Sequence, residues 1–142
     1  MEILINTIKD SCVRVFNELG SGHNEKIYHK ALKYELDCLG ICSDMERHIN
    51  VCYQDSKGNR HCIETERIDL YIFGINCSDI IVELKAISRV IQEPEKLQIR
   101  KYFRELRKEG INIEKGIIVN FPQPNSKDVR IEIDFEIIDN TI

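Results

Sequence analysis

The sequence predicts an α/β sandwich, in which a central mixed sheet is flanked by helices. Two amphipathic helical segments precede a run of strands, and a third separates the strand at 79–87 from the strand at 114–121. The strand at 79–87 is apolar on both faces, which is typical of a strand with helices on each side of its sheet. At 142 residues we expect a single domain, 1–142, ordered as two helices, three strands, a helix and two strands.

Apolar residues at helical spacing predict the three helices. The first covers residues 3–19, and the second covers residues 23–39 and ends at Gly40. The third covers residues 95–109 and buries a face formed by Ile99, Tyr102, Phe103 and Leu106.

Strands are predicted where β-branched and aromatic residues alternate with polar residues or run together. A polar turn at 55–59 joins the first two strands into a hairpin, whose return strand is long enough to be either bulged or broken. The predicted strands are residues 47–53, 60–73, 79–87, 114–121 and 129–138.

Composition excludes two broad classes of protein. The net charge of -4 argues against a generally basic protein that coats nucleic acid, and no apolar run is long enough to span a membrane. Glu2 and Lys9 interrupt the apolar residues at the start, which is not typical of a signal peptide. We therefore expect an intracellular protein, in bacterial cytoplasm or in the cytoplasm or nucleus of a host cell, and neither secreted nor bound to a membrane.

A charged pair interrupts the apolar strand at 79–87. Glu83 and Lys85 are two residues apart, so both side chains lie on the same face of the strand. Burying either charge without a partner would cost several kcal/mol. A simple salt bridge between them is the structural alternative to a functional site.

The preceding strand brings a second carboxylate to the same place. If the turn between the strands is centred on Asn76, Asp69 lies opposite Glu83. Two carboxylates a few ångströms apart repel each other unless a cation lies between them. Because an all-oxygen site suits magnesium or manganese, the sequence predicts a Mg²⁺ or Mn²⁺ site at Asp69 and Glu83.

Asp69 followed by Glu83-x-Lys85 on the next strand resembles the PD-(D/E)XK nuclease superfamily. The stretch from Gly22 to Tyr28 reads G-x-x-E-x-x-Y and is similar to the signature of the GxxExxY family, a small-domain branch of that superfamily. The proline of the superfamily's name is absent. The resemblance covers about residues 10–125, and its further matches are Ala31-Leu32, Glu35-Leu36, Glu46, Gln98 with Tyr102, and residues 118–121.

The resemblance implies the superfamily's sandwich fold and a metal-dependent nuclease that hydrolyses phosphodiester bonds in DNA. Asp69 and Glu83 would hold the divalent metal, helped by the main-chain carbonyl of Leu84. Lys85 would position the attacking water and stabilise charge on the phosphorane. The family occurs in bacteria and in large DNA viruses.

The resemblance also assigns roles to residues on the helices. Glu25 would bind a metal directly or through water, and Gln98 would orient the Lys85 amine or a water. Tyr28 and Tyr102 would support the site or contact phosphate. From the residues alone, Glu25 could equally be a helix N-terminal carboxylate, and Gln98 a solvated surface residue.

Positive charge is concentrated on the third helix and predicts a nucleic-acid interface. Residues 89–109 contain seven basic and four acidic side chains, a net charge of +3. A helix with such a stripe could follow a phosphate backbone, or it could be a solvated surface with ion pairs along it. Arg67 could bind phosphate too, or pair with Glu66 or Asp69. The stripe consists of Lys96, Arg100, Arg104 and Arg107.

A different class of function stays open beside the nuclease. The same fold could serve as a binding module that contacts DNA, chromatin or a protein partner, with weak or no catalysis. The sequence also leaves a homo-oligomer open. We expect no iron–sulfur cluster, because the last of the six cysteines, Cys77, precedes Glu83, whereas clusters in this superfamily need cysteines after the nuclease motifs.

Overall fold

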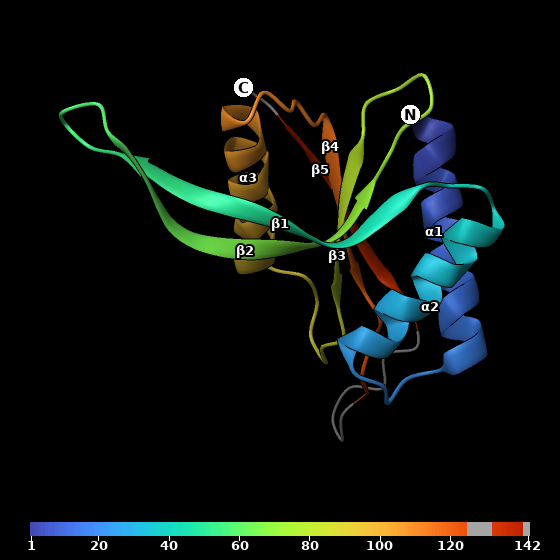
Figure 1. Cartoon of the computed structure of the whole chain (residues 1–142). Coiled ribbons are helices and arrows are strands. Elements are labelled where there is room, and N and C mark those ends of the chain that lie inside the picture. The colour runs from blue at the N-terminus through green and yellow to red at the C-terminus, as the bar shows by residue number, and fades with distance from the viewer. Residues whose placement is uncertain (125–131, 141–142) are drawn as a thin grey trace.

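Five strands form one mixed sheet with three helices in the computed structural model, which describes residues 1–124 and 132–140 (Figure 1). The strand order is β1-β2-β3-β4-β5; β3 and β4 are parallel and the other neighbours are antiparallel. The predicted α/β class and the order of the elements are confirmed. The elements are α1 (Glu2–Leu19), α2 (Glu25–Cys38), β1 (Ser43–Gln54), β2 (Arg60–Ile72), β3 (Ile80–Lys85), α3 (Glu93–Lys108), β4 (Lys115–Asn120) and β5 (Asp134–Asp139).

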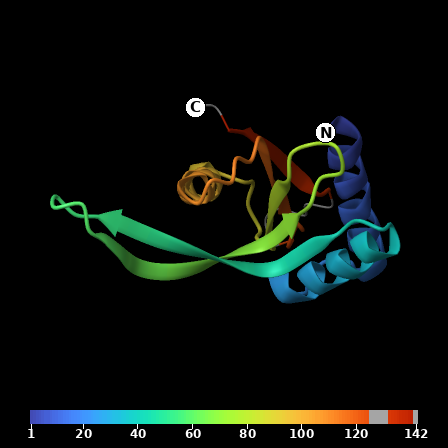
Figure 2. The ribbon, with the colours of Figure 1, turned by 45° about the horizontal axis from the view of Figure 1, so that its top comes forward.

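Helices cover both faces of the sheet (Figures 1 and 2). Helices α1 and α2 pack together on one face, and α3, which connects the parallel strands β3 and β4, lies on the other. Strand β3 supplies alternate residues to the two cores: Val82 and Leu84 pack with α1 and α2, whereas Ile81 packs with α3. This explains why its sequence is apolar on both faces. Within the described residues, none of the helices has the apolar length that crossing a membrane requires.

Several element boundaries differ from the prediction, and those of β1, α3 and β5 have identifiable reasons. Strand β1 begins at Ser43 rather than at 47, because Asp44 and Met45 also pair with β2. Helix α3 begins at Glu93 rather than at 95, because Pro94 is tolerated in the first turn of a helix. Strand β5 begins at Asp134, and residues 129–131 of the predicted strand lie outside the described part of the chain.

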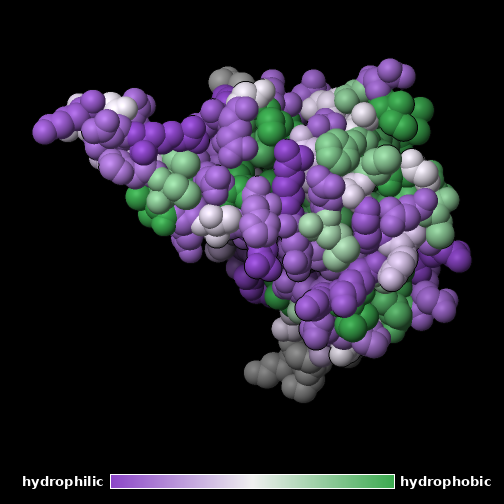
Figure 3. All heavy atoms as spheres, viewed as in Figure 1, coloured by the Kyte–Doolittle hydropathy of each residue, from purple (hydrophilic) through white to green (hydrophobic). Residues whose placement is uncertain are grey.

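The outer half of the β1–β2 hairpin projects from the body of the protein as an arm (Figures 1 and 2). Val51 pairs with Glu64 but the next residue, Cys52, pairs with Cys62, so the predicted bulge in β2 is confirmed. The turn at the tip is closed by Asp55, whose Oδ1 accepts hydrogen bonds from two main-chain N–H groups. Hydrophilic residues cover this tip (Figure 3).

We expect the close approach of α3 to β4 to make Gly116 intolerant of a side chain. A Cβ atom at Gly116 would lie 2.8 Å from Cγ2 of Ile99 and 3.2 Å from the ring of Phe103. Gly116→Ala should therefore lower the free energy of unfolding by about 1–3 kcal/mol, measured by urea denaturation.

The matched control is a double-mutant cycle with Ile99→Ala, which removes the nearest atom. The double variant should lose less stability than the sum of the two single variants. Strict additivity would show that this contact does not limit the packing of α3 on the sheet.

Candidate functional site

The candidate site lies where main-chain pairing between β2 and β3 stops. The last paired residues are Leu70 and Val82, so Asp69 and Glu83 come next in the register that the sequence predicts. Here side chains replace main-chain partners. The N–H of Asp69 donates to Oε1 of Glu83 (3.1 Å), and the N–H of Leu84 donates to Oδ2 of Asp69 (2.8 Å). These two hydrogen bonds fix the two carboxylates next to each other at the end of the paired part of β2 and β3.

The environment of Glu83 disfavours its ionised form. Its side chain is 3% exposed, and burial raises the pKa of its carboxyl well above the ordinary value of 4.5. The adjacent charge of Asp69 raises this pKa further, while Lys85 acts in the opposite direction. A cation between the carboxylates would remove this penalty.

A chain of hydrogen bonds connects Lys85 to α3. The Lys85 ammonium donates to Oε1 of Gln98 (3.4 Å), and Nε2 of Gln98 donates to the hydroxyl of Tyr102 (3.0 Å). The Tyr102 hydroxyl in turn donates to the main-chain oxygen of Arg67 (3.1 Å). Glu83 and Lys85 therefore contact different partners, which sets this site apart from the simple salt bridge.

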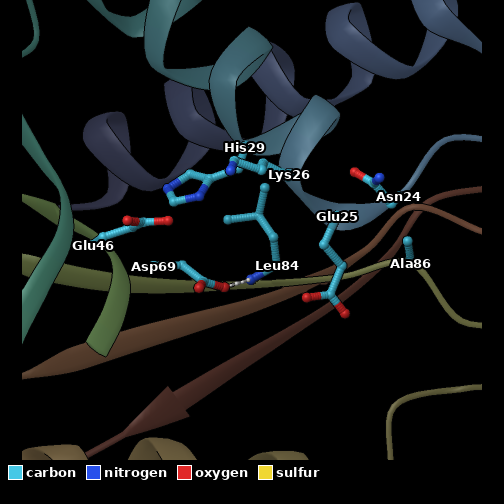
Figure 4. Close-up of a pocket in the computed structure, with 8 residues that line it drawn as sticks. All are labelled: Asn24, Glu25, Lys26, His29, Glu46, Asp69, Leu84 and Ala86. Atoms are coloured by element: carbon cyan, nitrogen blue, oxygen red, sulfur yellow. Dashed lines mark hydrogen bonds between the residues drawn. The ribbon is translucent and has the colours of Figure 1, made fainter. Parts of the chain in front are cut away.

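On the opposite face of β3, a pocket of about 510 Å³ opens between α2 and the sheet (Figure 4). Glu25 projects into it from the first turn of α2, and Asp69 lies across from Glu25 beyond Leu84. The Glu25 side chain remains accessible to solvent, yet partial burial raises its pKa, and the charge of Lys85 lowers it. The lining residues are Asn24, Glu25, Lys26, His29, Glu46, Asp69, Leu84 and Ala86.

Glu46 lies on β1, opposite Asp69 of β2. Its neighbours Met45 and Arg47 pair with β2, but Glu46 itself is skipped and has a φ of 53°, in the left-handed region. Such a conformation is costly for a residue with a side chain and is concentrated at functional sites. The Arg67 guanidinium lies 3.5 Å from the Glu46 carboxylate. Of the alternatives for Arg67, the structure shows an ion pair with Glu46 rather than with Glu66 or Asp69, and phosphate binding by Arg67 stays a prediction.

Tyr28 anchors the loop that precedes α2. Its buried ring stacks on Phe121 with centroids 4.4 Å apart, and its hydroxyl donates to the Gly20 oxygen (2.7 Å) and accepts from Gln123 (3.1 Å). Gly22 has a φ of 101°, which favours glycine, and its N–H also bonds to Gln123 (2.8 Å). The G-x-x-E-x-x-Y stretch therefore fixes where α2 begins and, with it, where Glu25 projects.

Comparison with known proteins identifies the family. The profile of the PD-(D/E)XK nuclease superfamily matches residues 2–132. The chain belongs to this superfamily. The crystal structure of SSO0001 has a similar fold, with a TM-score of 0.56 and 20% identity, over 83% of this chain and 51% of that one. The chain spans about half the length of SSO0001, and at this identity the likeness concerns the fold alone. None of the curated proteins searched matches the chain.

PD-(D/E)XK nucleases generally use divalent metals such as Mg²⁺. Asp69 and Glu83 fit such an ion chemically, because each keeps one carboxylate oxygen outside the two hydrogen bonds that fix the pair. Within residues 1–124 and 132–140, no group of three or more His, Cys, Asp or Glu side chains is arranged as a metal site. Two carboxylates suffice for Mg²⁺, which keeps several waters and completes its shell with substrate phosphates.

The basic stripe of α3 lies away from the carboxylates of Asp69 and Glu83. Gln98 and Tyr102 occupy the flank of α3 that faces β2, whereas the stripe faces β5. Lys96 lies 3.9 Å from Glu136, Arg100 lies 3.8 Å from Glu93, and Arg107 donates to Asn140 (2.8 Å). The stripe is thus a separate surface, and its role in binding nucleic acid stays a prediction.

Two pocket residues escaped the sequence analysis. His29 and Lys26 both line the pocket of Glu25 and Asp69 (Figure 4). The available signal was the spacing of Glu25 and His29, which are four residues apart on one helix and therefore on one face.

We expect the buried Glu83 to make the metal-free protein less stable at neutral pH than in acid. Because its pKa is raised, the folded state holds the Glu83 proton more tightly than the unfolded chain does. Its contribution to stability is therefore complete below about pH 4.5 and is lost as the pH rises through the folded-state pKa. In EDTA, Glu83→Gln should retain a higher Tm than wild type at neutral pH, with the difference vanishing in acid.

The measurement is thermal unfolding from about pH 4 to about pH 8, with and without Mn²⁺. Glu64→Gln, which removes a carboxylate exposed on β2, is the matched control and should follow wild type. If Glu83→Gln also follows wild type at every pH, the buried carboxylate pair is not a source of strain.

Proposed function

We propose that this chain is a metal-dependent nuclease of the GxxExxY branch, hydrolysing phosphodiester bonds in DNA with Mg²⁺ or Mn²⁺ as cofactor. One observation carries the proposal: Asp69 and Glu83 are locked side by side where a strand ladder ends, and Lys85 follows on the face of Glu83. Two adjacent carboxylates repel each other and do not stabilise the fold by themselves, whereas a cation bound between them would offset this repulsion.

In the proposed mechanism, Asp69 and Glu83 would hold the divalent ion, and Glu25 would bind it from α2 directly or through water. The ion would lower the pKa of its water and neutralise charge that develops on the phosphate. The raised pKa values of Glu83 and Glu25 are consistent with carboxylates that have been placed for a cation.

The Lys85 ammonium performs the second task. Gln98 holds it through the amide oxygen, and the hydroxyl of Tyr102 fixes which way that amide points. An ammonium oriented in this way can position the attacking water and stabilise the negative charge of the phosphorane. Gln98 and Tyr102 would therefore be positioning residues, as would Tyr28 through its hold on the start of α2.

The test is incubation of the protein with labelled single- and double-stranded DNA and RNA in Mg²⁺, Mn²⁺ or EDTA. We expect DNA to be cut in either metal and left intact in EDTA. If no metal supports cutting while the protein still binds DNA, chromatin or a protein partner, the binding-module alternative holds instead.

We expect Lys85→Met to separate chemistry from folding. Methionine keeps most of the stem and removes the charge, so Mn²⁺ binding, measured by isothermal titration calorimetry, should change by less than about twofold. The rate of cutting should fall by about 100-fold or more, because the charge acts mainly in the transition state.

Lys57→Met, which removes an exposed lysine from the turn at the tip of the β1–β2 arm, is the matched control and should cut like wild type. If Lys85→Met cuts as fast as wild type, this strand is not the catalytic one. If Lys85→Met loses much stability and its slower cutting is explained by unfolding alone, Lys85 has a structural role.

We expect the basic stripe of α3 to contribute phosphate contacts. Replacing Arg100, Arg104 and Arg107 by glutamine should weaken DNA binding and reduce the salt slope of log K by up to about 0.9 per lost contact. Fluorescence anisotropy at several salt concentrations measures both quantities. Arg14→Gln, on α1, is the control, and an unchanged slope in the triple variant would make the stripe a solvated surface.

A further inference from the structure

His29 is buried in the candidate site, and one of its two ring nitrogens has no hydrogen-bond partner among the described residues. Its side chain is 5% exposed, and Nε2 is fully buried and unpaired among the described residues. Buried polar groups are nearly always hydrogen-bonded, so an unpaired imidazole requires an explanation. Leaving such a group unpaired costs free energy, which a ligand hydrogen-bonded to the imidazole would recover.

The surroundings of His29 indicate where that ligand binds. The imidazole lies above the carboxylates of Glu46 and Asp69 in the pocket, and Glu25 projects from the preceding turn of the same helix (Figure 4). Glu46 is already paired with Arg67 at 3.5 Å. His29 is thus available to a molecule that occupies the pocket next to Asp69.

Hydrogen-bond donors gather on the α2 side of this pocket. Asn24 caps the helix by accepting from the N–H of Ile27 (3.3 Å), so the positive end of the α2 dipole faces the pocket, and Lys26 lines it as well. The opposite wall carries Asp69, which the proposed function assigns to the metal ion. A phosphodiester bound to a divalent cation satisfies both walls, because the cation meets the carboxylate and the phosphate oxygens accept from the donors.

We propose that His29 is a substrate-contacting residue, whose imidazole N–H donates a hydrogen bond to a non-bridging phosphate oxygen of the bound strand. In neutral histidine either ring nitrogen can carry this proton. His29 would contact the strand from α2, whereas Lys85, which Gln98 of α3 holds, would act on the attacking water. The proposal rests on the nuclease function and adds one contact to it.

The experiment compares His29→Leu with wild type on two kinds of DNA. One is ordinary DNA, and the other is a set of strands in which a methylphosphonate replaces one phosphate near the cut, which removes an acceptor oxygen. On ordinary DNA, His29→Leu should cut about 10-fold to 100-fold more slowly, as expected for a lost hydrogen bond to a charged group. On the strand modified at the contacted phosphate, the two proteins should cut equally.

Two further measurements separate a phosphate contact from other roles. The Kd for Mn²⁺ should stay within about twofold and the Tm should not fall, because leucine removes an unpaired polar atom. His61→Leu, at the tip of the β1–β2 arm, is the matched control and should cut like wild type.

Several outcomes would overturn the proposal. The first is that His29→Leu cuts ordinary DNA as fast as wild type. The second is a loss of Mn²⁺ affinity as large as the loss of cutting rate, or a drop in Tm large enough to explain the slower cutting. The third is that His29→Leu cuts more slowly than wild type by the same factor at every methylphosphonate position. If the wild-type protein cuts no DNA, the nuclease function fails. The same comparison, read as binding affinity for the modified strands, then decides the role of His29 separately.

Discussion

The site depends on two hydrogen bonds between β2 and β3: the N–H of Asp69 donates to Glu83, and the N–H of Leu84 donates to the carboxylate of Asp69. These bonds lie where main-chain pairing between β2 and β3 ends, so two carboxylate oxygens accept the hydrogen bonds that main-chain carbonyls accept elsewhere in the sheet. Because both carboxylates are fixed by N–H donors, neither can turn away from the other's charge. Burial raises the pKa of Glu83, and the adjacent charge of Asp69 raises it further. A cation bound by both carboxylates would relieve this repulsion.

Two tyrosines attach the flanking helices to this point in the same way. Tyr28 and Tyr102 are both buried, and each hydroxyl donates to a main-chain oxygen and accepts from a glutamine amide. Tyr28 fixes the loop from which Glu25 projects, and Tyr102 fixes the amide that holds Lys85. Their rings supply apolar burial, and their hydroxyl groups set positions with hydrogen-bond precision.

Much of the fold and part of the site could be predicted from local signals. The turn at Asn76, whose φ of 58° is tolerated by asparagine, sets the register that places Asp69 next to Glu83. The apolar face of α3 was predicted correctly, but the burial of Glu95 and Glu105 on the same helix was not. Charge patterns mark those two as surface residues. Their burial follows from the packing of α3 against the sheet and from the ion pairs of Arg89 with Glu95 and of Lys108 with Glu105.

The sequence by itself determined the pairing of Asp69 with Glu83 and the common face of Glu83 and Lys85, since a short turn and the two-residue period of a strand are local. Tertiary structure decided the rest of the pocket. Glu46 lines the pocket with Asp69 and pairs with Arg67, and its own left-handed conformation has no signature in the periodicity of the sequence. His29 lines the same pocket because α2 packs against β3. Such contacts join residues distant in sequence, and their geometry is fixed only when the helices settle on the sheet.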